Sequence, residues 1–166
     1  NESSLLPIQY EGKVKKICIK GPLANYKPII WAIGGSSAIH PPSYTTPLHA
    51  IREKINEIDI KDGFKFELVN NPEKADVVIY ITGKTHWFYN DCEGQDKRFL
   101  GLSKSKVKKI KKITQKNKNI IMVLYNGGPT DMTEWIDSIP VILQVWQPHQ
   151  EGGHAIADMI FGEANP

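Results

Sequence analysis

Short apolar runs alternate with longer amphipathic stretches along this 166-residue chain. The apolar runs are rich in β-branched residues and end at glycine, proline or asparagine, which is typical of strands. This pattern predicts strands over residues 14–19, 29–33, 64–68, 75–81, 120–125 and 141–145.

The amphipathic stretches predict helices between these strands. Thr46 and Pro47 form a typical helix start, an N-cap followed by proline at the first helical position. The apolar face of this helix comes from residues spaced three or four apart, namely Leu48, Ile51, Ile55 and Ile58. Further helices are expected over residues 103–118, near 132–136 and over 153–161.

The last predicted helix follows a glycine pair and stops at Gly162. Its first turn, at Gly153, is expected to lie against another backbone. Glu151 could cap its free N–H groups, and we interpret Glu151 as structural rather than catalytic. The residues expected to face inward are Ala155, Ile156, Met159 and Ile160.

Strands that alternate with helices, several of them uniformly apolar, indicate a mostly parallel sheet covered on both faces. The predicted fold is therefore an α/β three-layer sandwich (α/β/α) with about six strands. At this length, residues 1–166 form a single domain.

The net charge of +3 is too small to indicate a nucleic-acid partner, and no run of eighteen apolar residues predicts a membrane span. Eight lysines nevertheless lie in residues 103–118. They could form a patch for nucleic acid or an anionic membrane, or the solvated outer face of a helix that covers the sheet. We favour the outer face, because no interleaved aromatics or second basic cluster accompany the lysines.

The sequence predicts neither a metal nor a cofactor. Cys18 lies in an apolar run and Cys92 in a polar loop, without the spacing of a zinc site. The Gly34–Ser37 segment lacks the ending of a phosphate-binding loop.

Residues 83–98 form the longest polar segment, and it follows a predicted strand of a parallel sheet. Glu93, which a glycine follows, is the candidate general acid/base, with Asp91 as its rival. Glu93 could also be an ordinary solvated loop acid. Trp87 and Tyr89 could stack on a sugar ring or anchor the loop.

Five segments, in order, resemble the second domain of family 3 glycoside hydrolases, the β-glucosidase-like enzymes. They are KGPLANY (20–26), GGSSAIHPPSYTTPLHAI (34–51), DCEGQDKR (91–98), YNGGPTDMTEWIDSIPVILQVW (125–146) and WQPHQEGGHAIADMIFGEANP (146–166). The resemblance implies a six-stranded α/β sandwich that follows a barrel domain.

The resemblance also implies site residues. Glu93 matches the family's general acid/base, while Asp96 and Arg98 would order its loop. Ser36, Ser37 and His40 would lie near the barrel and could contact substrate. The family commonly has arginine directly after the aspartate, where this chain has Lys97 and then Arg98.

The resemblance implies a retaining β-glycosidase, which needs a second carboxylate across the scissile bond. In this family an aspartate on the N-terminal barrel is the nucleophile. The substrate is then a β-linked sugar, by default a β-glucoside, with β-xylosides and N-acetylglucosaminides left open.

The chain opens on Asn1 and ends at Pro166, so we expect a piece of a longer protein whose compartment cannot be read from these ends. The isolated piece is expected to be inactive. One alternative is a non-catalytic domain that binds carbohydrate or packs on the barrel. A third interpretation is a flavodoxin-like module that holds an anionic partner on the lysine helix.

Overall fold

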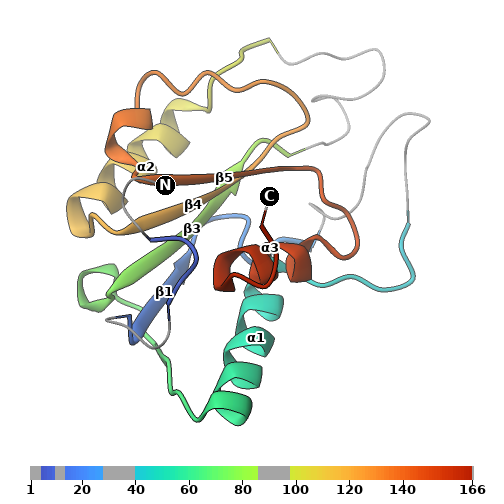
Figure 1. Ribbon diagram of the computed structural model, residues 1–166. Helices are drawn as coiled ribbons and strands as arrows, with labels where there is room; N and C mark the ends of the chain where they lie inside the picture. Colours follow the sequence, from blue (N-terminus) through green and yellow to red (C-terminus); the bar gives the residue numbers. More distant parts are fainter. Residues whose placement is uncertain (1–4, 10–13, 28–39, 86–97, 166) are drawn as a thin grey trace.

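The protein folds as an α/β/α sandwich (Figure 1). The structure, a computed structural model, describes residues 5–9, 14–27, 40–85 and 98–165. Within these residues, five parallel strands form one sheet in the order β2-β1-β3-β4-β5. The elements are β1 (Lys16–Lys20), α1 (Pro47–Asp62), β2 (Glu67–Leu68), β3 (Val77–Gly83), α2 (Lys104–Lys116), β4 (Ile120–Tyr125), β5 (Val141–Trp146) and α3 (Gly152–Phe161).

The predicted three-layer fold is confirmed. The strand expected over residues 29–33 lies outside the described residues, so the sheet has five described strands. The edge strand β2 is shorter than the alternation of residues 64–68 predicted, since only Glu67 and Leu68 pair with β1. Phe64 and Phe66 pack edge to face instead, with ring centroids 4.9 Å apart.

Strand β1 begins two residues later than predicted. The Asp76 carboxylate accepts hydrogen bonds from the backbone N–H groups of Lys15 and Lys16, at 2.8 and 2.7 Å. Pairing with β3 then begins at Ile17, which lies opposite Val77. The side chain of Asp76 thus sets where the strand begins.

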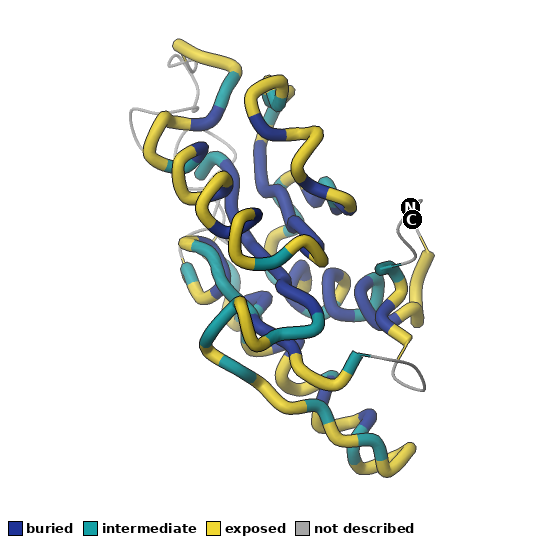
Figure 2. Tube along the Cα trace, turned by 90° about the vertical axis from the view of Figure 1, so that its left-hand side faces the viewer, coloured by how far each residue is buried: buried dark blue, intermediate teal, exposed yellow. Residues whose placement is uncertain are grey.

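Two apolar cores lie on the two faces of the sheet, because side chains alternate along each strand. In β3, Val77, Ile79 and Ile81 face one core, whereas Val78 and Tyr80 face the other. Figure 2 shows the buried positions gathered inside the molecule, with exposed positions on the outer sides of the helices.

Helices α1 and α3 cover one face and α2 covers the other (Figure 1). Helix α1 starts as predicted, with the Thr46 hydroxyl accepting the N–H of His49 at 3.4 Å and Pro47 in the first turn. On α2, Val107, Ile110 and Ile113 are buried against the sheet. Its lysines other than Lys106 are exposed, as the outer-face interpretation predicts, whereas Lys106 is partly buried.

The inward face of α3 differs from the predicted one. Ala155 is exposed, whereas Ala157 is buried beside Ile156 and Ile160. The buried face follows the helical spacing that continues from Gly153, and this spacing carries Ala155 to the outside. Glu151 occupies the N-cap position, but its carboxylate makes no capping bond.

The short helix expected near residues 132–136 is a 3-10 helix at Ile136–Ser138. A turn closed by hydrogen bonds from Trp135 and Ile136 to the Met132 carbonyl occupies the predicted place. Among the described residues, no helix combines the length and apolar character needed to cross a membrane.

Candidate functional site

The carboxyl ends of the strands meet at one edge of the sheet, where parallel α/β folds bind ligands. The loops after β3, β4 and β5 leave from this edge. The segment before α1 joins them, because the Thr45 N–H donates to the Gln150 carbonyl at 3.3 Å. The Gln150 side chain in turn donates to the Ser43 hydroxyl at 3.1 Å.

Strand β3 is the central strand, and the long polar segment begins where it ends. Gly83 closes the strand with φ of 147°, a conformation that favours glycine. A Cβ at this position would lie 1.8 Å from the Tyr125 carbonyl oxygen. The Lys84 N–H donates to the same oxygen at 2.7 Å. The close approach of β3 and β4 therefore fixes where the segment leaves the sheet.

Lys84 also joins both ends of this segment to a neighbouring turn. Its ammonium group donates to the carbonyl oxygens of Leu100 and Pro129, the latter at 3.2 Å. The Leu100 carbonyl accepts a second hydrogen bond, from the Asp131 N–H at 3.2 Å. Gly101 and Asp131 form an isolated parallel bridge beside it. We call Lys84, Leu100, Pro129 and Asp131 the loop clamp.

The turn after β4, which receives the clamp, is itself held rigidly. Asn126 is 1% exposed and its amide donates to the Thr130 hydroxyl at 2.6 Å. The side-chain oxygen of Asn126 accepts a hydrogen bond from the side-chain amide of Gln144 on β5. Asp131 accepts two hydrogen bonds from Thr133, backbone and side chain, which lower the pKa of its carboxyl. These contacts indicate a structural role for this turn.

Most of the candidate site residues lie outside the described residues: Glu93, Asp91, Trp87, Tyr89, Asp96, Ser36 and Ser37. His40 and Arg98 are described, and both are exposed. His40 begins the segment that contacts the loop after β5, and Arg98 lies two residues before Leu100 in the loop clamp. Both segments that carry the candidate site residues therefore have a described end near the carboxyl edge of the sheet.

Trp146 is a residue at this edge that no sequence pattern singled out. It is the last residue of β5, has φ of 52° and is 55% exposed. Buried and more exposed positions alternate along β5, and Trp146 lies at one of the more exposed positions. Lys84 carried no sequence signal, because its acceptors are backbone carbonyls distant in sequence.

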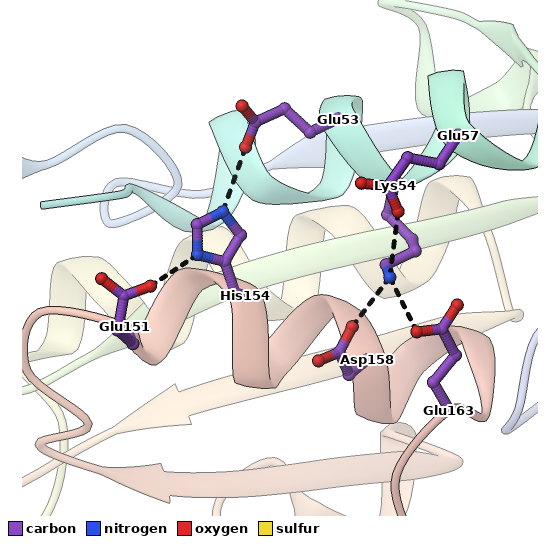
Figure 3. A network of polar contacts seen from close by, with 7 residues as sticks. All are labelled: Glu53, Lys54, Glu57, Glu151, His154, Asp158 and Glu163. Carbon is purple, nitrogen blue, oxygen red and sulfur yellow. Dashed lines mark hydrogen bonds and ion pairs between the residues drawn. The ribbon is translucent and has the colours of Figure 1, made fainter.

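A second polar cluster lies between α1 and α3 (Figure 3). His154 contacts Glu151 through Nδ1 at 2.8 Å and Glu53 through Nε2 at 3.2 Å. The hydrogen bond with Glu151 raises the pKa of His154, burial opposes this, and Glu53 adds to it. His49 contacts the other oxygen of Glu53 at 3.2 Å.

Lys54 forms the other half of this cluster. Its ammonium group lies 3.1 Å from Glu57, 3.0 Å from Asp158 and 2.8 Å from Glu163 (Figure 3). Burial by itself lowers the pKa of Lys54, but the hydrogen bonds with these carboxylates outweigh it and raise the pKa. An open pocket lined by residues of α1 and α3, Ile60 among them, lies beside this cluster. We interpret the cluster as a structural contact.

No group of three or more histidine, cysteine or acidic side chains suited to a metal ion occurs in the described part of the chain. Cys18 is a free, buried thiol, and burial raises its pKa. It lies in β1, within the apolar run in which the sequence places it.

A parallel α/β/α sandwich with long polar loops at its carboxyl edge defines a class of ligand-binding and enzyme domains. Comparison with known proteins identifies the family. The model of the glycosyl hydrolase family 3 C-terminal domain matches residues 1–166, and the chain belongs to this family. The resemblance inferred from the sequence is confirmed.

Curated relatives agree with this assignment. The chain is 30% identical to a beta-xylosidase of Formosa agariphila, covering 100% of this chain and 25% of that protein. It is 29% identical to thermostable beta-glucosidase B of Acetivibrio thermocellus, covering 100% of this chain and 23% of that protein. The chain thus spans about a quarter of the length of these relatives.

Solved structures show the same fold. A family 3 beta-glucosidase of Bifidobacterium adolescentis aligns with a TM-score of 0.74 and 26% identity, over 98% of this chain and 24% of that one. A family 3 beta-glucosidase of Neurospora crassa aligns with a TM-score of 0.76 and 25% identity, over 99% and 22% of the two chains.

Proposed function

We propose that this chain is the C-terminal domain of a retaining β-glycosidase and supplies the general acid/base to an active site shared with an N-terminal barrel domain. Membership of family 3 over the whole chain is the observation that carries the proposal. Relatives named beta-xylosidase and beta-glucosidase, of which the chain spans about a quarter, support a longer enzyme with a further domain. In this proposal residues 1–166 are one domain of that enzyme.

Glu93 is the proposed acid/base. The segment that contains it connects the central strand of the sheet to the loop clamp, so both of its ends are held at the carboxyl edge. As an acid it would protonate the departing oxygen, and as a base it would then activate water. Asp96 and Arg98 are proposed to order the segment, with Trp87 and Tyr89 stacking on sugar.

The proposed substrate is a terminal β-D-glucosyl or related residue. Ser36, Ser37 and His40 are proposed to contact substrate or barrel. The nucleophile belongs to the barrel, so the isolated domain is expected to show no turnover. Turnover of nitrophenyl β-glycosides by residues 1–166 alone would contradict this division of the site.

The test of Glu93 compares Glu93→Ala and Asp91→Ala in the full-length protein. Loss of the acid/base lowers kcat/KM for substrates with poor leaving groups by roughly 10²- to 10⁴-fold. Azide restores part of kcat on substrates with good leaving groups, because it attacks the glycosyl-enzyme without base assistance. We expect this behaviour for Glu93→Ala and near-normal rates for Asp91→Ala.

The reverse result would assign the role to Asp91. If neither variant shows azide rescue or sensitivity to the leaving group, the domain is non-catalytic. It then binds carbohydrate or packs against the barrel.

A further inference from the structure

Lys84 lies where the central strand β3 passes into the segment that contains Glu93. Its ammonium group donates to the Leu100 carbonyl, sixteen positions further along the chain. It also donates to the Pro129 carbonyl at 3.2 Å, forty-five positions away in the turn after β4. One side chain thus joins the beginning of the loop, its end and a neighbouring turn.

The partners of Lys84 are themselves fixed. The Leu100 carbonyl also accepts the Asp131 N–H, and Asp131 is held by Thr133. A second lysine acts at the same place, since the Lys106 ammonium on α2 donates to the Gly83 carbonyl at 2.5 Å. The two ends of the loop are therefore tied to β4, to α2 and to each other.

We propose that Lys84 is a positioning residue for the general acid/base, because it holds the two described ends of the loop that carries this carboxyl group. This inference rests on the proposed function, because it requires that residues 86–97 supply the proton donor. Lys84 does not touch the substrate in this proposal and acts only through the loop.

The physical reason is that proton transfer tolerates little misplacement of the donor. A donor must lie within hydrogen-bond reach of the leaving oxygen, and a displacement of about 1 Å can cost about 100-fold in rate. A loop with one free end must lose additional conformational freedom each time it reaches the reactive geometry. Lysine suits the role because its ammonium group has several donors and can bond two carbonyl oxygens at once.

The test uses the full-length enzyme with Lys84→Met, which keeps most of the side-chain stem but removes the donors. Lys84→Arg keeps a charged group with several donors. Lys108→Met is the matched control, since Lys108 is an exposed lysine on the neighbouring α2. Thermal unfolding of each variant shows whether the protein is folded at the assay temperature.

The readout is kcat/KM on two β-glycosides of the same sugar, one with a dinitrophenolate leaving group and one with an alkoxide. Only the alkoxide needs a proton from the acid. For Lys84→Met we expect kcat/KM on the alkyl glycoside to fall roughly 10- to 100-fold, and on the dinitrophenyl glycoside less than about threefold. Lys84→Arg restores most of the loss, and Lys108→Met leaves both rates unchanged.

Equal losses on both substrates would overturn the proposal, because Lys84 would then support the site in general. Unchanged rates would overturn it as well. Glu93→Ala and Asp91→Ala are assayed beside Lys84→Met. They show whether the role of Lys84 alone fails or the proposed function fails as well. If one of them discriminates between the leaving groups and Lys84→Met does not, only the role of Lys84 fails. If neither discriminates, the proposed function fails and the role of Lys84 fails with it.

Discussion

Gly153 in the first turn of α3 lies directly against Thr45, the residue before the N-cap of α1. A Cβ on Gly153 would lie 2.5 Å from the Thr45 carbonyl oxygen and 2.9 Å from that of Thr46. Both contacts are with backbone atoms, which cannot rotate away as a side chain can. The two helices therefore begin at the same edge of the sheet, and their first turns touch through the backbone.

Gly153→Ala should destabilise the protein. Alanine is the better helix former, but its methyl group must displace the backbone before α1, and such overpacking typically costs about 1–3 kcal/mol. The free energy of unfolding, measured in urea, checks this. Gly128→Ala is the control, since a Cβ there meets nothing within 4 Å, and we expect a change of at most about 0.5 kcal/mol. Equal effects of the two substitutions would contradict the close approach.

Lys54→Met should also destabilise the protein, by about 1–3 kcal/mol. The substitution leaves three carboxylates close together without their shared cation, namely Glu57, Asp158 and Glu163. Their repulsion is screened by salt, so the difference from wild type should shrink in about 1 M sodium chloride. Lys108→Met, on the outer face of α2, is the control for loss of one positive charge. A loss of stability that does not depend on salt would point to packing instead.

His154 should make stability depend on pH. Its pKa is raised above the ordinary value of 6.5 by Glu151, against the effect of burial, and further by Glu53. The stabilisation from protonated His154 is therefore fully present below 6.5 and is lost as pH rises through the raised pKa. The unfolding midpoint of wild type should thus exceed that of His154→Gln below pH 6.5, and this difference should decrease as pH rises above 6.5.

A set of variants separates the groups that contribute to this pH dependence. Glu151→Gln should reduce it, because Glu151 is the main cause of the raised pKa. His49 contacts the same Glu53, so the comparison is repeated in the His49→Gln background. A difference between wild type and His154→Gln that stays constant with pH would show that the ion pairs do not form in solution.

Much of the fold was predictable because its signals are local. Thr46 caps α1 and Pro47 begins it, as predicted, since both preferences are properties of a single turn of helix. The prediction that Gly153 meets another backbone was correct, but only the structure identified the carbonyl of Thr45 as the atom that it meets.

The errors arose where the partner of a residue could not be read from the local pattern. The expected strand at 64–68 shrank to Glu67–Leu68, which pair with Lys16 and Ile17 at the start of β1. Glu151 occupies the expected cap position, but its carboxylate bonds His154 rather than the helix N–H groups. A stronger partner one turn away decided where that side chain points.

By itself the sequence determined the class of fold, the family and the candidate residues, because periodicity, caps and motifs are read along the chain. Tertiary structure alone decided that Lys84 meets Leu100 and Pro129, and that Lys54 gathers carboxylates from two segments. Some of these partners are dozens of positions apart. The pairing of β3 with β4 brings Lys84 close to Pro129, and the packing of α1 against α3 brings Lys54 close to Asp158 and Glu163. Hydrogen bonds to backbone carbonyls leave no pattern of residue types, so geometry must supply them.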